Sequence, residues 1–204
     1  MSAYVIGLTG GIACGKSNLS SALRTAGACV IDADQISRAL TAPGGEALPA
    51  IRAAFGSGVF AGDSLNRRAL GALVFEDEKA RERLNAITHP LVFKEMRRQL
   101  DGCAGAAVLD VPLLFECGID AWCDEIWCAY LPQREQVKRL MARDGLTRGE
   151  ALGRIRAQMP AREKARRSDR VIRTDGSREE SARIVLSLWR ELSPNIRKEK
   201  GETL

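Results

Sequence analysis

The stretch "GLTGGIACGKSNLS", residues 7–20, decides the fold because it contains the pattern G-x-x-x-x-G-K-[ST]. An apolar segment typical of a β-strand precedes the pattern, and a helical pattern over residues 16–25 follows it. In this context glycines let backbone N–H groups converge on phosphate oxygens, and the helix N-terminus adds partial positive charge. We therefore predict a phosphate-binding loop in which Lys16 reaches the β- and γ-phosphates and the Ser17 hydroxyl ligates Mg²⁺. The residues assigned to nucleotide binding are Gly10, Gly11, Ile12, Ala13, Cys14, Gly15, Lys16 and Ser17.

Short segments rich in β-forming residues alternate with helical patterns along the chain, which indicates an α/β fold. The segment "AAVLDV", residues 106–111, lacks polar alternation, as expected for a central strand that helices cover on both faces. Gly27 is expected to end the first helix with a left-handed cap, and Ser177 with Glu180 to begin a final core helix. We predict a P-loop NTPase core with a mostly parallel five-stranded sheet flanked by helices. The predicted strands are residues 4–9, 29–32, 107–111, 125–130 and 171–173.

Two long segments interrupt this alternation within what we expect, at 204 residues, to be a single domain. Residues 42–105 carry three helical patterns and are predicted to be a helical insertion that binds the acceptor. Residues 132–169 are basic and are predicted to be a helical lid. The helical patterns of the insertion are residues 46–55, 67–75 and 79–100; the core is assigned to residues 1–41, 106–131 and 170–193, and a frayed tail to residues 194–204.

The bulk composition favours an ordered cytoplasmic protein. No apolar run approaches the ~20 residues that span a bilayer, and the N-terminus lacks the features of a secretory signal. The six cysteines include no C-x-x-C pair and His89 is the only histidine, so we expect plain thiols and no zinc site. We expect no membrane association and favour a monomer.

The net charge of +5 suggests an anionic partner, and residues 131–173 hold thirteen Arg or Lys against five Asp or Glu. Such a segment can be a solvated helical surface, a nucleic-acid-binding surface, or a lid that closes arginines on the β- and γ-phosphates. The absence of aromatic residues between Tyr130 and Trp189 disfavours base stacking there. Within a lid, Arg143 is the first candidate to contact the transferring phosphate, and Arg139 is the second.

A nucleotide site alone fits a kinase, a switch GTPase or an ATP-driven motor. The N-K-x-D type of motif that reads guanine does not occur in the sequence, and a motor usually needs a longer chain. A small-molecule kinase needs a carboxylate near the acceptor hydroxyl and cations over the transferring phosphate. The sequence therefore has to supply a carboxylate at the sheet edge that faces the ligand.

Three carboxylates follow predicted strands. Asp32 and Asp34 in "VIDAD" lie two residues apart at the end of a strand, on the edge where ligands of parallel sheets bind. We predict that Asp34 accepts or orients the proton of the acceptor hydroxyl, with Asp32 supporting it; alternatively, Asp34 only caps the helix that begins "QISRAL". Asp110 in "VLDVPLLFE" can hold Mg²⁺ through water, or can be a solvated residue at the start of a loop.

Several segments, in order from residue 4 to residue 189, together resemble the dephospho-CoA kinase family. The resemblance implies a nucleotide-kinase-like core with a lid and a CoA-binding lobe, and transfer of the ATP γ-phosphate to the ribose 3′-hydroxyl of dephospho-CoA, the last step of coenzyme A synthesis. The leading hypothesis is thus an ATP- and Mg²⁺-dependent phosphotransferase with an alcohol acceptor. Another P-loop small-molecule or nucleotide kinase, and a P-loop regulator that binds RNA, remain as alternatives. The segments are "GLTGGIACGKS", "VIDAD", "LNRRALGALVF", "ITHPLV", "DVPLLFE", "RLMARDGLTRGEALGRIRAQM" and "SDRVI".

The resemblance also assigns roles by position. It implies that Asp34 is the general base, that Arg143 is the lid arginine, and that Lys164 is a lid lysine. The family's R-x-x-x-Q pair falls on Arg154 and Gln158, which would contact the nucleotide. The residues implied for the acceptor lobe are Leu65, Arg67, Phe75, His89 and Pro90, of which His89 could equally be a helix-start histidine.

The sequence departs from the family pattern at three places. Cys14 stands where the family usually has serine or threonine, which backbone cradling tolerates. Ser168 replaces the usual alanine before Asp169, and "RTDG" lacks the common asparagine before Gly176. The last departure leaves the adenine contact near residues 174–176 open.

Overall fold

The computed structural model describes residues 3–199, without the side chains of Phe75, Glu76 and residues 193–199. The chain divides into two compact units. The first combines Met1–Ile31 with Cys103–Leu204 and carries both the P-loop and the basic segment, and the second is Asp32–Gly102. The second unit thus begins ahead of the boundary near residue 42 that the sequence suggested.

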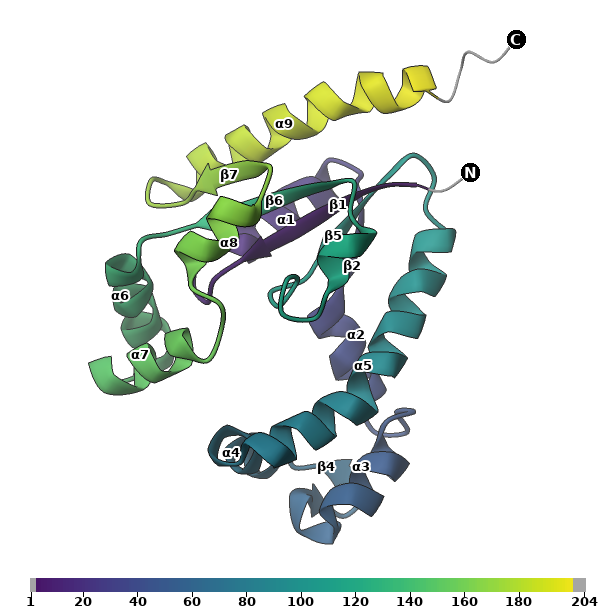
Figure 1. The fold of residues 1–204 in the computed structure, drawn as a ribbon, viewed down its shortest axis with the longest axis vertical. Helices are drawn as coiled ribbons and strands as arrows, with labels where there is room; N and C mark the ends of the chain where they lie inside the picture. Colours follow the sequence, from purple (N-terminus) through teal and green to yellow (C-terminus); the bar gives the residue numbers. More distant parts are fainter. Residues whose placement is uncertain (1–2, 200–204) are drawn as a thin grey trace. The chain divides into compact units, whose positions relative to one another are not determined.

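A five-stranded sheet forms the centre of the first unit, with β1 as its middle strand (Figure 1). The pairs β1–β5, β1–β6 and β6–β7 are parallel, and β2 lies beside β5 at one edge. All five predicted strands are confirmed, and the "AAVLDV" strand is an interior one. In sheet order the strands are β2 (Cys29–Asp32), β5 (Ala106–Asp110), β1 (Tyr4–Gly10), β6 (Glu125–Tyr130) and β7 (Arg170–Arg173).

Helices cover both faces of this sheet, as the sequence predicted for a parallel sheet. In Figure 1, α8 (Ala161–Arg167) lies in front of the sheet and α1 (Lys16–Thr25) lies behind it. The final helix, α9 (Arg178–Glu199), packs against α1 and β7. Trp127 on β6 is fully buried at the centre of the core. The other buried residues of the core are mainly aliphatic and include Ile6, Leu8, Leu19, Leu23, Val108, Ile172 and Val185.

The ends of two core helices follow their sequence signals. Gly27 adopts φ 85° directly after the C-cap of α1, which confirms the left-handed ending. At the start of α9, the Ser177 hydroxyl accepts a hydrogen bond from the backbone N–H of Glu180 at 3.0 Å. The helix α9 continues past Pro194 to Glu199, so regular structure extends beyond the boundary expected at residue 194.

The basic segment forms three helices, of which α6 (Gln133–Asp144) and α7 (Arg148–Arg156) pack against each other. Their shared apolar face places Leu140 and Ala151 in full burial. A capping box between Thr147 and Glu150 starts α7. The third helix, α8, packs on β1 and β6 instead, so it contributes to the core of the first unit.

The second unit is mainly helical and has its own apolar core around Ile51 and Leu70. Its three predicted helices are confirmed as α3 (Leu48–Phe55), α4 (Arg67–Glu76) and α5 (Glu78–Asp101), and it also contains α2 (Ala33–Leu40). It further contains a short hairpin that the sequence analysis did not predict. The hairpin pairs β3 (Phe60–Ala61) with β4 (Ser64–Leu65) through a two-residue Gly-Asp turn, in which Gly62 adopts φ 61°.

Proline interrupts the hydrogen bonding of the long helix α5. Pro90 lies inside the helix and has no N–H, so the carbonyl group of Ala86 has no helical donor there. Figure 1 shows α5 changing direction along its length, as expected for a helix that contains proline. His89, one residue earlier, is therefore a mid-helix residue, and the suggestion that it starts a helix is wrong.

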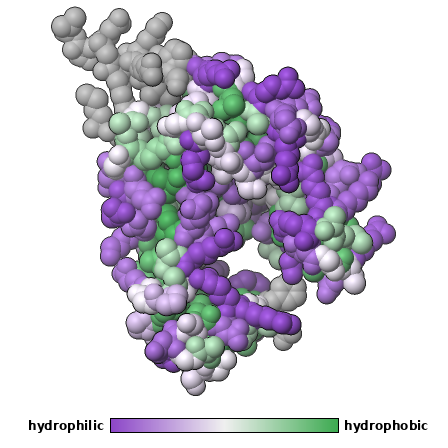
Figure 2. Space-filling model, turned by 180° about the vertical axis from the view of Figure 1, so that it is seen from behind, coloured by the Kyte–Doolittle hydropathy of each residue, from purple (hydrophilic) through white to green (hydrophobic). Residues whose placement is uncertain are grey.

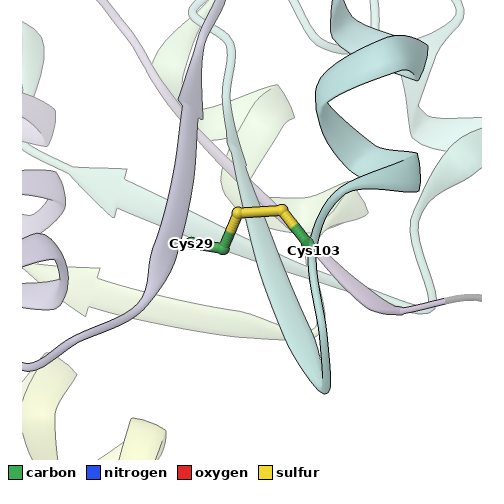
Figure 3. The surroundings of a disulfide bond; sticks show 2 residues. All are labelled: Cys29 and Cys103. Atoms are coloured by element: carbon green, nitrogen blue, oxygen red, sulfur yellow. A yellow bond between two sulfur atoms is a disulfide. The ribbon is translucent and has the colours of Figure 1, made fainter.

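A disulfide bond joins Cys29, the first residue of β2, to Cys103, which precedes β5 (Figure 3). The two Cα atoms are 6.2 Å apart and the cysteines are separated by 74 positions in the sequence. The prediction that all six cysteines are thiols is therefore wrong for this pair. The sequence did not reveal the bond, because two cysteines far apart in the chain form no local spacing motif. The chain leaves the first unit after Ile31 and returns at Cys103, so the bond closes a loop that contains the whole second unit.

We expect Cys29→Ser to lower the free energy of unfolding by about 2–4 kcal/mol, because an open loop of this length gains entropy in the unfolded chain. Urea unfolding of the oxidised protein, the reduced protein and the variant measures this difference. Cys117→Ser, at a half-buried free thiol, is the matched control and should unfold close to the native midpoint. Equal midpoints for oxidised native protein and Cys29→Ser would contradict the prediction.

The surface is mainly hydrophilic over the face that Figure 2 shows. Within residues 3–199, none of the helices combines the length and the apolar character needed to cross a bilayer. The large apolar side chains that are exposed come one each from different elements, which is ordinary for a folded domain. They are Leu73, Leu113, Met141, Val171 and Ile184.

Candidate active site

The P-loop connects the end of β1 to the start of α1, as the glycine pattern predicted. Gly15 is the N-cap of α1, adopts φ 79° and leaves the first turn without a side-chain cap. Ala13 adopts φ 61° and is the one non-glycine residue with positive φ in the described part of the chain. Alternating right- and left-handed residues direct successive N–H groups to one side, which makes a concave anion site. The loop therefore has the backbone shape that binds phosphate.

Lys16 forms an ion pair with Asp110. Asp110 ends β5 opposite Leu8 of β1, so the register of the two parallel strands brings the carboxylate to the edge where the P-loop begins. The Asp110 side chain is 3% exposed and that of Lys16 is 15% exposed. Ser17, in the first turn of α1, is exposed. Asp110 therefore lies beside the P-loop, and its role toward Mg²⁺ stays a prediction.

Of the two arginines predicted for a lid, Arg139 is the one that lies beside the P-loop. Its Nη2 donates to the backbone carbonyl of Thr174. A Cβ atom at Gly15 would lie 3.5 Å from Arg139 Nη1 and 3.5 Å from Thr174 Cβ, so both side chains lie against the loop. Arg139 on α6 is thus well placed to neutralise phosphate charge.

Arg143 lies one turn further along α6 and pairs with Asp144 through two hydrogen bonds of 2.7 and 3.0 Å. Arg154 of α7 binds the same carboxylate at 3.1 Å, so Arg143 and Arg154 meet at Asp144. Hydrogen bonding from Arg143 lowers the pKa of Asp144, and the same pair raises the pKa of Arg143. The Arg143 guanidinium therefore stays charged at any physiological pH.

Gln158, the partner of Arg154 in the R-x-x-x-Q pair, follows the end of α7. Its Oε1 atom is buried and has no hydrogen-bond partner among the described residues. An acceptor left without a donor is costly in a packed interior, so this amide is a natural contact for a ligand N–H or a water molecule.

Lys164, the residue implied as a lid lysine, lies on α8. Its side chain is completely buried, donates to the carbonyl of Pro112 and pairs with Glu116 at 2.8 Å. Glu116 also accepts from the backbone N–H of Met159 at 2.9 Å. Lys164 and Glu116 together hold the "PLLFE" turn against the sheet, and the implied lid role of Lys164 stays a prediction.

In the second unit, the carboxylate of Asp32 caps a helix, whereas that of Asp34 is exposed. Asp32 caps α2 by accepting from the backbone N–H of Gln35 at 3.0 Å and from its side-chain amide at 3.0 Å. Asp34 lies in the first turn of α2, is exposed, and makes no hydrogen bond or ion pair with another described residue. The alternative that Asp34 caps the helix is therefore wrong, and its carboxylate is open for chemistry.

The residues implied for the acceptor lobe are spread over the second unit. Leu65 packs at the edge of its apolar core, and Arg67 donates to the carbonyl of Arg38 at 3.0 Å. The His89 ring lies 5.5 Å from the ring of Phe93, and burial lowers the pKa of His89, so the ring is neutral at neutral pH. Pro90 is exposed on α5, and the side chain of Phe75 lies outside the described residues.

Two polar residues of the site were missed by the sequence analysis. Gln136 on α6 donates to the carbonyl of Ile12 at 2.8 Å, and the Thr174 hydroxyl donates to the carbonyl of Cys14 at 2.7 Å. Gln136 lies on the same helix face as Leu140, so a glutamine in the apolar stripe was the available signal. Thr174 lies in the "RTDG" segment, which the sequence analysis marked as a departure from the family and as the place of an adenine contact left open.

Cys14 is a buried thiol in the P-loop. Burial raises the pKa of Cys14 to about 11, so the thiol is protonated at neutral pH. Its Sγ lies 3.1 Å from Nε2 of Gln136. The cysteine thus fills space beneath the loop without adding charge, as expected where backbone amides form the cradle.

Comparison with known proteins supports the kinase hypothesis and not the RNA-binding alternative. A family model described as dephospho-CoA kinase matches residues 4–180. The chain is 44% identical to the dephospho-CoA kinase of Geobacillus kaustophilus over 191 residues, which covers 91% of this chain and 95% of the relative. It is 45% identical to that of Geobacter sulfurreducens over 198 residues, covering 93% and 99% of the two chains.

Solved structures agree with these sequence similarities. A crystal structure from Thermus thermophilus superposes with a TM-score of 0.81 at 36% identity and covers 94% of this chain and 99% of its own. The dephospho-CoA kinase of Campylobacter jejuni superposes with a TM-score of 0.70 at 26% identity, with 94% and 98% coverage.

Proposed function

The chain belongs to the dephospho-CoA kinase family, and we propose how its residues perform ATP-dependent phosphorylation of the ribose 3′-hydroxyl of dephospho-CoA. The observation that carries the proposal is the left-handed, uncapped P-loop with Lys16 and Asp110 paired at its edge. Such a loop offers converging N–H groups and one lysine cation to a triphosphate. We assign the ATP phosphates to residues 10–17.

We propose that positive charge from the lid stabilises the transferring phosphoryl group. Lys16 contacts the β- and γ-phosphates, and Arg139 and Arg143 act from α6. Arg154 and Gln158 add nucleotide contacts from the end of α7. The support is the position of Arg139 against Gly15 and the arginine pair that meets at Asp144.

We propose that Asp34 is the general base. The acceptor hydroxyl loses its proton to this carboxylate as its oxygen bonds the γ-phosphorus, while the bond from that phosphorus to the β-phosphate oxygen breaks and ADP leaves. An exposed carboxylate without a structural partner suits this task. The proposed acceptor contacts in the second unit are Asp32, Leu65, Arg67, Phe75, His89 and Pro90.

The residues present also fit Mg²⁺. In the described part of the chain no three His, Cys, Asp or Glu side chains gather as a metal site. Mg²⁺ usually keeps several waters and binds through one or two protein groups together with substrate phosphates, and the Ser17 hydroxyl and the Asp110 carboxylate are oxygen donors of the kind it uses. We propose that the Ser17 hydroxyl ligates it directly and Asp110 holds it through water; when bound, the ion neutralises charge on the β- and γ-phosphates. We also propose that the enzyme acts as a cytoplasmic monomer.

Purified protein with ATP, Mg²⁺ and a panel of acceptors tests the reaction. We expect phosphorylation of dephospho-CoA in preference to adenosine, gluconate and nucleoside monophosphates. Mass spectrometry should give coenzyme A as the product, and NMR should locate the new phosphate on the ribose 3′-oxygen. Equal use of several acceptors, or phosphate on another oxygen, would contradict the proposal and favour a different small-molecule kinase.

A further inference from the structure

We propose that Gln136 and Thr174 are positioning residues that hold the P-loop in its phosphate-binding shape. Neither side chain needs to touch ATP, because each binds a carbonyl group of the loop. The inference rests on the proposed function, since it concerns the loop to which ATP binding is assigned.

The two hydrogen bonds flank the unfavourable backbone of Ala13. A residue with a Cβ atom disfavours the left-handed region, yet Ala13 adopts φ 61°. The carbonyl of Ile12, immediately before Ala13, accepts from Gln136, and the carbonyl of Cys14, immediately after it, accepts from Thr174. Bonds on both sides prevent the loop from relaxing to a more favourable conformation.

Anchoring these carbonyls also directs the amides that face phosphate. In a trans peptide unit the C=O and the following N–H point in opposite directions. The Ile12 carbonyl points toward Gln136, so the N–H of Ala13 in the same peptide unit points away from Gln136. The Cys14 carbonyl points toward Thr174, so the N–H of Gly15 points away from Thr174. The two side chains thus orient two N–H groups of the anion site.

Burial and packing make both anchors rigid. Gln136 is 2% exposed and Thr174 is 4% exposed. A Cβ atom at Gly11 would lie only 2.6 Å from Nε2 of Gln136, so the glutamine amide is packed directly under the loop. The backbone N–H of Thr174 donates to the carbonyl of Tyr130 at 3.0 Å, and its own carbonyl accepts from Arg139, which holds the hydroxyl in place.

The test uses substitutions that remove the hydrogen-bond donor and keep the volume. We expect Gln136→Met and Thr174→Val each to weaken ATP binding about tenfold, by calorimetry without acceptor and in the KM for ATP, because an oriented donor is lost. The KM for dephospho-CoA should stay near the native value. Thr174→Ser, which keeps the hydroxyl, should retain native affinity.

Two controls separate positioning from general destabilisation. Gln133→Met, at the exposed start of α6, should bind ATP as the native protein does. In an Ala13→Gly background, where the left-handed conformation is no longer disfavoured, the loss caused by Gln136→Met should shrink. A structural role alone would lower thermal stability equally in both backgrounds and would not depend on residue 13.

The outcomes are distinguishable. Native ATP affinity in both folded Gln136→Met and Thr174→Val would overturn the inference, as would an equal rise in the KM of both substrates. The two variants act on opposite sides of Ala13, so either one tests the idea if the other fails to fold. Failure of the native protein to phosphorylate dephospho-CoA would overturn the proposed function and leave the ATP-binding comparison intact.

Discussion

Asp34→Ala should lower kcat by about 100- to 10,000-fold, the usual contribution of a general base, while ATP affinity stays near the native value. The physical reason is that Asp34 has an exposed carboxylate with no structural partner in the described residues. The neighbouring Asp32 performs the capping of α2. Removing the Asp34 carboxylate should therefore lower kcat and leave the free energy of unfolding unchanged.

Steady-state kinetics with dephospho-CoA and calorimetry with ATP measure the two effects separately. Asp32→Ala is the matched comparison, since it removes a helix cap and should lower the free energy of unfolding by about 1 kcal/mol. Asp34→Asn, which keeps the size and loses the basicity, should be as inactive as Asp34→Ala. If Asp34→Ala lost ATP affinity and stability together, Asp34 would be a structural residue.

Lys16→Met should lower kcat/KM for ATP by about 100- to 1,000-fold, because it removes the P-loop cation to which we assign contact with the transferring phosphate. It should also lower stability, since the substitution takes away the ion pair of Asp110, whose side chain is only 3% exposed. Breaking one side of such a pair leaves a charge in a poorly solvated place. The loss of activity and the loss of stability thus have different causes.

A double substitution separates the two causes. Lys16→Met with Asp110→Asn removes both charges, so it should regain about 1–3 kcal/mol of the lost stability but none of the lost activity. Urea unfolding measures the stability of the native protein, the two single variants and the double variant, and steady-state kinetics with ATP measure their activity. Together these four proteins form a double-mutant cycle. An active Lys16→Met, or a double variant no more stable than Lys16→Met, would contradict the assignment.

Local patterns in the sequence predicted most of the core. The strands over residues 29–32 and 125–130 and the helix over residues 16–25 have the predicted bounds, because their periodicity and glycine ends are local signals. The hairpin at residues 60–65 was missed because its strands are only two residues long. His89 was given an open role because a proline inside a helix resembles a helix boundary.

Side-chain roles were harder to predict where many equivalent residues compete. Thirteen basic residues lie between residues 131 and 173, and no local pattern separates Arg139, which lies against Gly15, from Arg143, which pairs with Asp144. Lys164 carries the same charge as its neighbours, yet it is completely buried. Burial and partners depend on the whole fold, so composition alone could not assign them.

The sequence by itself determined the P-loop, the five strands and the kinase family. Each of these depends on short motifs or patterns whose residues are close together in the chain. Only the tertiary structure decided what holds that loop, since Ile12 meets Gln136 across 124 positions and Cys14 meets Thr174 across 160. The disulfide between Cys29 and Cys103 also joins distant positions, which are 74 residues apart in the sequence. Interactions between distant positions leave no periodic signal in one chain, and they form only when the sheet brings the ends of its strands together.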